Sequence, residues 1–534
     1  MGPIPIRLLV LLSALGLMGL APAPLELAPL PSGATGTGAP PVLPDWRALA
    51  RAPGPARPAG QLRGMALLAA DTLPELDRFS EPELLAGIAR RQGRNGALAL
   101  VLLRGSFELA ELARAAADPA ALEQDGDVFT LRRPLVIRRG AALVLPEGGV
   151  LRLATASRAF LVNGGQLILR GARITSWDAA RGAPSALERD RQFRPFVAAI
   201  GGSWTEITRS TLSHLGYHAA KPYGLSLVSG PSSLAAAGPP TGRITGSRIS
   251  GNYYGVYSYE AEGVVITDNA LVDNIVYGLD PHDRSRRLGI AGNTAIGTRR
   301  KHGIIVSRGV SDSWILENRA IGNAGTGIAI DAASSDNVVA RNLAAANRGD
   351  GFSLFESPHN LLWGNLAIGN RKSGLRIRNG WVLEVHRNAF VGNGYDGVEA
   401  YAEQLGPELE NKWRSAAELR LGLSLGCTCS PVTRAARSTS AIPAELICRG
   451  SMAAAMRGRC ASAANCGRGP RRSKRASSIE AGSASSAASN TRRRTGSRDR
   501  ALPLLSCALN GGDPPPPVRV RGWPGWRGRA GGRQ

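Results

Sequence analysis

The stretch GVVITDNALVDNIVYGLDPHDRSRRLGIAGN, residues 263–293, contains the repeat that decides the fold of this 534-residue chain. Two short strand-like runs in it end at Asn269 and Asn293, which lie 24 residues apart. A period in the low twenties without a helical pattern is typical of stacked β-coils. We therefore expect an all-β fold, a right-handed parallel β-helix with coils of 23–25 residues and a small helical N-terminal section.

Two ladders of residues carry this period along the chain. Glycines that open a short alternating run recur at spacings of 23, 25, 24, 24, 23 and 23 residues: Gly255, Gly278, Gly303, Gly327, Gly351, Gly374 and Gly397. Asparagines that end a strand recur in the same way: Asn269, Asn293, Asn318, Asn342, Asn365 and Asn388. Asparagine tolerates the left-handed backbone of a tight corner, and stacked amides can hydrogen-bond between coils, so we predict a structural role for this ladder.

The alternation after each glycine predicts which side chains face outward. First and third positions are mostly apolar and should fill the interior. The fourth positions, facing outward, are Tyr259, His282, Ser307, Asp331, Phe355, Arg378 and Tyr401. The second positions, also outward, are Tyr257, Asp280, Ile305, Ala329, Ser353, Arg376 and Glu399. Coils lie roughly 4.8 Å apart, so these columns form a mixed aromatic, basic and acidic strip of the kind that binds a long carbohydrate; a solvated polar face is the alternative.

One coil is chemically unusual, because residues 280–283 spell DPHD. Pro281 removes a hydrogen-bond donor from its strand. Asp280 shares the face of His282, and Asp283 follows where the strand turns, so one or both carboxylates can orient the imidazole and set its tautomer. Arg308 in the next coil should lie diagonally beside His282. A histidine base beside an arginine can abstract the proton α to a uronate carboxylate while the arginine neutralises the developing charge; alternatively, Arg308 merely pairs with Asp283.

The N-terminal part predicts an exported protein. Residues 1–23 contain one arginine, an apolar run and small residues at a cleavage site, which is the pattern of a signal peptide. No later segment reaches membrane-spanning length. We interpret residues 24–60, rich in Pro, Ala and Gly, as a linker, and residues 61–125 as a helical cap. Residues 126–404 form the expected β-helix with its catalytic groove.

Residues 405–534 differ in character from the rest of the chain. They hold 23 Lys and Arg against 7 Asp and Glu, so they carry +16 of the net charge of +24. All six cysteines lie there: Cys427, Cys429, Cys448, Cys460, Cys466 and Cys507. The segment is a disordered basic arm, a disulfide-rich module, or a stretch translated out of frame, and its Arg, Ala, Gly, Pro, Ser and Cys content favours the last. No nucleic-acid recognition motif accompanies the charge, so nucleic acid is not an expected partner.

The stretch GLDPHDRSRRLGIAGNTAIGTRRKHGIIVSR (residues 278–308), with NYYGVYSYEA before it and DGFSLFESPHNLLWGN after it, closely resembles the periplasmic mannuronan C5-epimerases of bacterial alginate biosynthesis. The resemblance covers roughly residues 125–404 and is most specific in DPHD and KHGIIVSR; the sequence after about 404 does not match. It implies a β-helix that converts β-D-mannuronate to α-L-guluronate within polymannuronate. His282 would remove the C5 proton and Arg308 would neutralise the carboxylate.

The resemblance also implies a periplasmic location, no metal or organic cofactor, the alginate polymer as partner, and proteins of an alginate export complex as further partners. The expected catalytic residues are His282, Arg308, Asp280 and Asp283. The expected substrate-binding residues are Tyr257, Tyr259, Asp331, Phe355, Arg376 and Arg378. Lys221 and Tyr223 are weaker candidates for reaching the substrate, and His302 for supporting the site. The alternatives are a polyuronate lyase acting by β-elimination and a non-catalytic polysaccharide-binding β-helix of an export complex.

Overall fold

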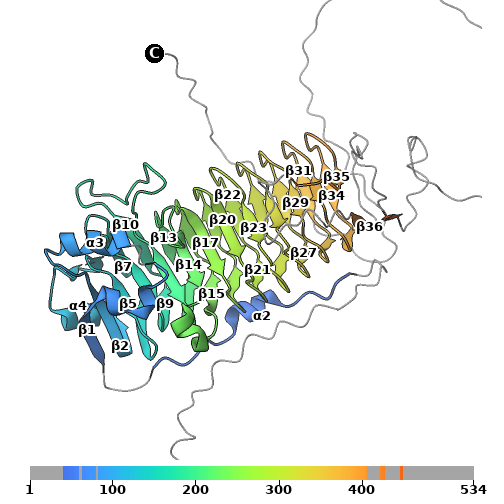
Figure 1. Cartoon of the computed structure of the whole chain (residues 1–534). Coiled ribbons are helices and arrows are strands. Elements are labelled where there is room, and N and C mark those ends of the chain that lie inside the picture. Colours follow the sequence, from blue (N-terminus) through green and yellow to red (C-terminus); the bar gives the residue numbers. More distant parts are fainter. Residues whose placement is uncertain (1–39, 59–62, 80–81, 406–420, 427–444, 449–534) are drawn as a thin grey trace, which may run out of the picture. The chain divides into compact units, whose positions relative to one another are not determined.

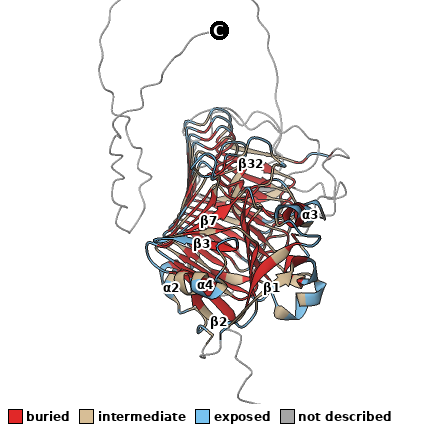
Figure 2. Ribbon diagram, turned by 90° about the vertical axis from the view of Figure 1, so that its left-hand side faces the viewer, coloured by how far each residue is buried: buried red, intermediate tan, exposed pale blue. Residues whose placement is uncertain are grey.

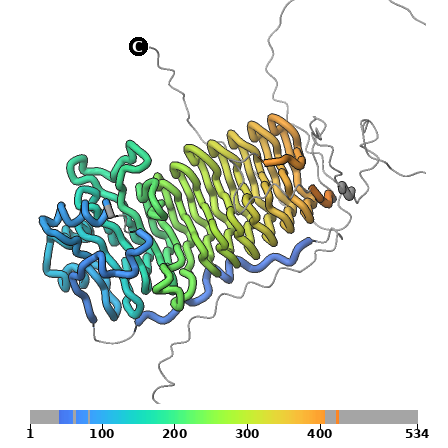
Figure 3. The backbone as a smooth tube through the Cα atoms, in the orientation of Figure 1, coloured from blue at the N-terminus to red at the C-terminus, as the bar shows by residue number. Residues whose placement is uncertain are grey.

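The computed structural model describes residues 40–58, 63–79, 82–405, 421–426 and 445–448. Within them the chain winds into a parallel β-helix, and consecutive coils lie side by side along it (Figures 1 and 3). This confirms the all-β solenoid expected from the period. Each regular coil contributes one strand to each of three sheets, which we call the first, second and third sheet.

The first sheet carries the outward column predicted from the glycine ladder. Its strands are β5 (Leu135–Ile137), β8 (Leu161–Asn163), β11 (Val197–Ile200), β14 (Gly224–Val228), β17 (Tyr254–Tyr259), β20 (Tyr277–His282), β23 (Ile304–Ser307), β26 (Ile328–Asp331), β29 (Phe352–Phe355), β32 (Leu375–Arg378) and β35 (Val398–Tyr401). Each pairs in parallel with the equivalent strand of the next coil, which fixes one register along the sheet.

The second and third sheets complete each coil. The second consists of β6 (Ala141–Leu145), β9 (Gln166–Arg170), β12 (Trp204–Thr208), β15 (Thr241–Thr245), β18 (Val265–Thr267), β21 (Gly289–Ala291), β24 (Trp314–Leu316), β27 (Val338–Ala340), β30 (Leu361–Trp363), β33 (Leu383–His386), β36 (Gly422–Gly426) and β37 (Glu445–Cys448). The third consists of β3 (Leu122–Asp125), β4 (Val128–Leu131), β7 (Val150–Ala154), β10 (Arg173–Trp177), β13 (Thr211–Ser213), β16 (Arg248–Ser250), β19 (Ala270–Val272), β22 (Thr294–Ile296), β25 (Arg319–Ile321), β28 (Leu343–Ala345), β31 (Leu366–Ile368) and β34 (Ala389–Val391).

The interior of the coils is a continuous apolar core. Inward positions of the first sheet stack in register and are at most 1% exposed: Val256, Leu279, Ile304, Ile328, Phe352 and Leu375. Burying each such side chain contributes on the order of 1.5–3 kcal/mol. Figure 2 shows this buried interior as red strands inside the paler outer turns.

The asparagine ladder has the structural role predicted for it. From Asn269 to Asn365, each side-chain Nδ2 donates to the Oδ1 of the next asparagine at 2.9–3.0 Å and to a main-chain carbonyl. A second ladder, which we did not predict, joins Asn323, Asn347, Asn370 and Asn393 in the same way at 2.9 Å. These amides satisfy backbone groups that the dry corners of the coil would otherwise leave unpaired.

Replacing Asn342 by Ala is expected to lower the free energy of unfolding by about 3 kcal/mol. Its Oδ1 accepts from the main-chain N–H and the Nδ2 of Asn318, at 2.9 and 3.0 Å, and both donors would lose this partner in the buried corner. Urea unfolding followed by circular dichroism measures the effect. Asn95→Ala, at an exposed position, is the control, and equal stability of the two variants would contradict a structural ladder.

Within the region interpreted as a linker, the structure describes residues 40–58, which contain a short helix. Helix α2 (Trp46–Arg51) begins after Asp45, whose side chain accepts hydrogen bonds from the main-chain N–H groups of Arg47 and Ala48. Trp46 is 4% exposed and packs with Trp314 and Ala291 of the second sheet. The Pro, Ala and Gly content of this segment is typical of a linker. The packing of Trp46 on an apolar face of the second sheet is a contact that local sequence does not indicate.

The N-terminal section contains two helices, α3 (Pro82–Arg91) and α4 (Leu109–Ala116), and also two strands. β1 (Gly64–Ala69) pairs antiparallel with β2 (Leu98–Glu108), and β2 pairs in parallel with β5 and β6. The parallel pairing of the β-helix therefore begins before residue 126, at strand β2. Short 3₁₀ turns complete this part of the fold: η2 (Ala70–Thr72), η3 (Pro74–Leu76) and η4 (Ser232–Ala237).

At the other end, strand pairing continues past the expected boundary at residue 404, since β36 pairs with β33 and β37 pairs with β36. The predicted signal peptide, most of the basic tail and all cysteines except Cys448 lie outside the described residues. Among the residues that are described, no helix is long and apolar enough to cross a membrane.

Candidate active site

The register of the first sheet stacks the two predicted columns of residues in neighbouring coils. Tyr259 pairs with His282, His282 with Ser307, and Ser307 with Asp331. The column continues through Phe355, Arg378 and Tyr401. The second-position column includes the pairing of Tyr257 with Asp280 and of Ser353 with Arg376, although Tyr257, Asp280 and Ser353 are buried. The predicted site residues of both columns therefore lie on one sheet, in neighbouring coils.

Strand β20 is irregular where the DPHD segment lies. It pairs with β23 only at Leu279–Ile304 and at His282–Ser307, and Pro281, between them, has no N–H to donate. Directly after His282 the chain leaves the strand through Asp283 and Arg284, whose φ angles are 42° and 57°. A left-handed backbone at consecutive residues other than glycine is strained and is common at functional sites. The turn places the Asp283 carboxylate against the imidazole.

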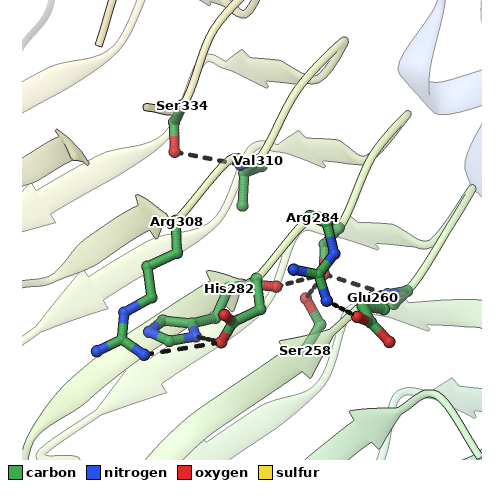
Figure 4. A network of polar contacts seen from close by, with 10 residues as sticks. Ser258, Glu260, His282, Arg284, Arg308, Val310 and Ser334 are labelled. Atoms are coloured by element: carbon green, nitrogen blue, oxygen red, sulfur yellow. Dashed lines mark hydrogen bonds and ion pairs between the residues drawn. The ribbon is translucent and has the colours of Figure 1, made fainter. Parts of the chain in front are cut away.

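His282 and Arg308 lie side by side (Figure 4), and both contact the carboxylate of Asp283. The Oδ2 atom of Asp283 hydrogen-bonds the Nδ1 of His282 and lies 4.0 Å from a guanidinium nitrogen of Arg308. Burial opposes ionisation of Asp283, but the hydrogen bond from His282 and the charges of His282 and Arg308 lower its pKa overall. An ionised carboxylate only accepts hydrogen bonds, so Nδ1 of His282 is the donor to Asp283, and Nε2 is the nitrogen left to act as a base. The imidazole is thus held in the tautomer of a base.

The three side chains differ in their access to solvent. The side chain of Arg308 is 50% exposed, that of His282 is 17% exposed and that of Asp283 is 9% exposed. At 4.0 Å the contact between Arg308 and Asp283 is long for an ion pair. Arg308 can therefore turn its guanidinium to an incoming carboxylate while Asp283 stays behind the imidazole.

Asp280 and Tyr257 lie beneath this surface. Asp280 is 2% exposed, and its Oδ1 has no hydrogen-bond partner among the described residues. Burial raises the pKa of Asp280 to about 7, although the charges of His282 and Arg308 oppose the rise. Tyr257 is 3% exposed because Lys221 and Tyr223 cover it, and its ring centroid lies 5.7 Å from that of His282. Asp280 and Tyr257 are therefore buried near the imidazole of His282, whereas the sequence predicted that both side chains would face outward.

The raised pKa of Asp280 makes stability depend on pH. Its pKa in the folded chain exceeds the unfolded value of about 3.9, so its contribution is fully present below about pH 4 and is lost as the pH rises through 7. The loss is about 4 kcal/mol at most. We expect the melting temperature of Asp280→Asn, relative to the unmodified protein, to rise between pH 5 and pH 8. Asp312→Asn is the control, and a difference that stays constant with pH would contradict the burial of an ionisable Asp280.

The remaining predicted residues lie further along the same strip. Arg378 donates to the Oε1 of Glu356 at 2.7 Å, and Arg376 lies 3.4 Å from a carboxylate oxygen of Glu399. Both guanidinium groups also lie near the ring of Phe355, at 4.7 and 6.0 Å from its centroid. These arginines are therefore held in place by acidic partners, and they form a platform with Phe355 away from His282.

An aromatic group near the site was predicted only in part, through Tyr223. The rings of Tyr223 and Tyr254 stack at 4.5 Å, and Tyr254 contacts Tyr277 edge-on at 4.9 Å. Tyr277 stacks on His302 at 5.7 Å, and the Nδ1 of His302 accepts the main-chain N–H of Thr326 at 3.0 Å. Burial lowers the pKa of His302 to about 4, so this ring is neutral. A signal was available, since Tyr254 and Tyr277 each precede a glycine of the ladder.

The described residues contain no group of three or more His, Cys, Asp or Glu side chains arranged to hold a metal ion.

Comparison with known proteins gives three kinds of match. The family model described as periplasmic copper-binding protein (NosD) matches residues 224–418. The mannuronan C5-epimerase of Pseudomonas putida is 40% identical over 306 residues, which are 56% of this chain and 59% of that protein. The mannuronan C5-epimerase of Pseudomonas aeruginosa is 41% identical over 325 residues, or 60% of each chain. This chain thus spans about three fifths of the length of the curated relatives.

This chain covers a larger share of two solved structures than of the curated relatives. The crystal structure of the periplasmic alginate epimerase AlgG superposes with a TM-score of 0.69 at 29% identity, covering 77% of this chain and 98% of that one. A double-mutant form of AlgG gives the same TM-score of 0.69 at 30% identity and 99% coverage of its chain.

Proposed function

This chain belongs to the family of the periplasmic mannuronan C5-epimerases, and from that premise we propose that it is an isomerase that epimerises β-D-mannuronate to α-L-guluronate at C5 within polymannuronate, in the periplasm. One observation carries the proposal. The Nδ1 of His282 is bound to the ionised Asp283, and the half-exposed Arg308 lies 4.0 Å from the same carboxylate. A base and a cation that can bind a carboxylate therefore lie side by side.

The proposed reaction begins when Nε2 of His282 takes the proton from C5 of a mannuronate residue. The electron pair of the broken C–H bond moves into the carboxylate and forms an enediolate. Arg308 binds this group and neutralises the charge that develops there. Water or a groove residue then delivers a proton to the opposite face of C5, which inverts that carbon. The substrate gains and loses one proton, so no co-reactant is required.

The environment of His282 suits this step. Asp283 holds the ring in position and stabilises the imidazolium that forms when the proton is taken. Asp280, largely protonated below about pH 7, adds little negative charge beneath the ring. The buried Tyr257 fixes the ring from the same side. We assign His282 and Arg308 to direct contact with substrate, and Asp280 and Asp283 to holding and tuning the base.

We further propose that polymannuronate lies along the first sheet, on Tyr259, Asp331, Phe355, Arg376 and Arg378. Coils roughly 4.8 Å apart present a new outward residue at nearly the repeat of a sugar chain. Aromatic rings and arginines are the side chains that stack on sugars and bind carboxylates. The catalytic unit would then lie within residues 126–404. Proteins of an alginate export complex are proposed as further partners, since a polymer in the periplasm is in transit.

Incubation of the protein with polymannuronate tests the proposal. Proton NMR measures guluronate, and ultraviolet absorbance measures unsaturated uronate. Guluronate without absorbance growth is the expected result. A polyuronate lyase removes the same proton but expels the C4 oxygen, so absorbance without guluronate would favour β-elimination. If neither product forms, the non-catalytic polysaccharide-binding β-helix is the better account.

A further inference from the structure

Lys221 lies beside the proposed base, on the side away from Arg308. Its Nζ lies 3.2 Å from the ring centroid of Tyr259, which is the strand partner of His282 in the preceding coil. Arg308 follows β23, in the coil on the other side of His282. The imidazole is thus flanked along the sheet by two cations, each associated with an adjacent coil.

The backbone of Lys221 is strained and firmly held. Its φ is 75°, in the left-handed region that residues with a β-carbon rarely adopt. Its carbonyl accepts hydrogen bonds from the main-chain N–H of Tyr223 at 2.9 Å and from the hydroxyl of Ser226 at 2.7 Å, and its own N–H donates to Ala219 at 3.0 Å. Such strain persists only where the surroundings enforce it, and it occurs frequently at ligand sites.

The charges that face Lys221 come from several elements. Asp283 attracts its ammonium, while Arg78, Arg284 and Arg308 repel it. Arg78 also lies over the Tyr259 ring, 5.5 Å from its centroid, and donates to the carbonyl of Gly230 at 2.9 Å. Burial is the largest effect and lowers the pKa of Lys221 to about 8. The four cations here, Lys221 and these three arginines, outnumber the two acidic groups that pair with them, Asp283 and Glu260. A further anion would therefore be stabilised, and a polyuronate carries one carboxylate per residue.

We propose that Lys221 binds the carboxylate of the uronate next to the one held by Arg308, so that the site recognises two consecutive uronates. This inference rests on the proposed epimerase function and names a determinant of its substrate. Coils roughly 4.8 Å apart bring Lys221 and Arg308 to opposite sides of His282 at the spacing of neighbouring sugars. Because Lys221 contacts the neighbour and not the reacting ring, its loss should weaken binding more than turnover.

The test compares Lys221→Met, Lys221→Arg and the unmodified protein on two polymers. One is polymannuronate, and the other is polymannuronate in which about half of the carboxylates have been reduced to alcohols, so that many mannuronates lack a charged neighbour. On the fully charged polymer we expect Lys221→Met to raise KM about tenfold with kcat nearly unchanged, and Lys221→Arg to restore most of the loss. On the reduced polymer the unmodified protein and Lys221→Met should have similar KM values. Arg319→Met, which removes one charge from the third sheet, is the control.

Two results overturn the inference: an unchanged KM in Lys221→Met, or a loss of the same factor on both polymers. If Lys221→Met does not fold, Lys221→Gln serves for the same comparison. A binding measurement separates this inference from the proposed function. In a His282→Asn background, calorimetry with mannuronate oligomers should show about tenfold weaker binding for Lys221→Met, whether or not the protein turns over. If the unmodified protein forms no guluronate from polymannuronate, that result would count against the proposed function alone.

Discussion

Replacing His282 by Asn is expected to lower the rate of guluronate formation by at least about 10³-fold, near the upper range for loss of a general base. The asparagine amide can still donate to Asp283, so the turn after β20 and the position of Asp283 are kept. It has no basic nitrogen to take the C5 proton. The measurement is the initial rate of guluronate formation by proton NMR, together with a melting curve that shows the variant to be folded.

The control for this variant is His359→Asn. His359 is an exposed histidine beside Asp336, 3.9 Å from its carboxylate, and it lies outside the first sheet. Its replacement should leave the rate within about twofold. Unchanged guluronate formation in a folded His282→Asn variant would exclude His282 as the base, because a different group would then be removing the C5 proton.

Replacing Arg308 by Met is expected to lower kcat/KM by about 10²–10³-fold, since the enediolate would form without a cation to neutralise it. Lysine at the same position should recover only part of the loss, because a point charge cannot bind both carboxylate oxygens as a guanidinium does. Steady-state kinetics on polymannuronate measures both variants. Most of the loss should appear in kcat, since the charge on the carboxylate group grows in the transition state.

Arg341→Met is the matched control for Arg308. Both arginines are about half exposed, both have a positive φ, and Arg341 lies 3.7 Å from a carboxylate of Glu317 much as Arg308 lies 4.0 Å from Asp283. If Arg308 only formed an ion pair with Asp283 between coils, Arg308→Met and Arg341→Met would show similar small losses of stability and similar activity. A selective loss of activity in Arg308→Met supports carboxylate binding.

The sequence predicted the repeat and the register of the site because both are local properties. The glycine ladder marks the start of each strand, and the period of two then decides which side chains face outward. For this reason the pairings of Tyr259 with His282 and of Ser307 with Asp331 were predicted correctly. The position of Arg308 beside Asp283 follows from the same register.

What lies over the site could not be predicted in this way. Lys221 and Tyr223 belong to a segment between strands, and no periodicity places such a segment above Tyr257. Trp46 packs on Trp314, more than 200 residues away in sequence, so its contact is invisible to any local pattern. The pairing of Arg378 with Glu356 was missed because Glu356 lies just beyond the alternating run that assigned the outward positions.

The incorporation of solvent deuterium at C5 tests the central claim most directly. Polymannuronate is incubated with the protein in D₂O, and the guluronate formed is analysed by proton NMR and mass spectrometry. If His282 removes the proton and a different group returns one from the opposite face, each new guluronate carries deuterium at C5 and no unsaturated uronate appears. Guluronate that retains the original hydrogen at C5, or unsaturated uronate in its place, would contradict the account.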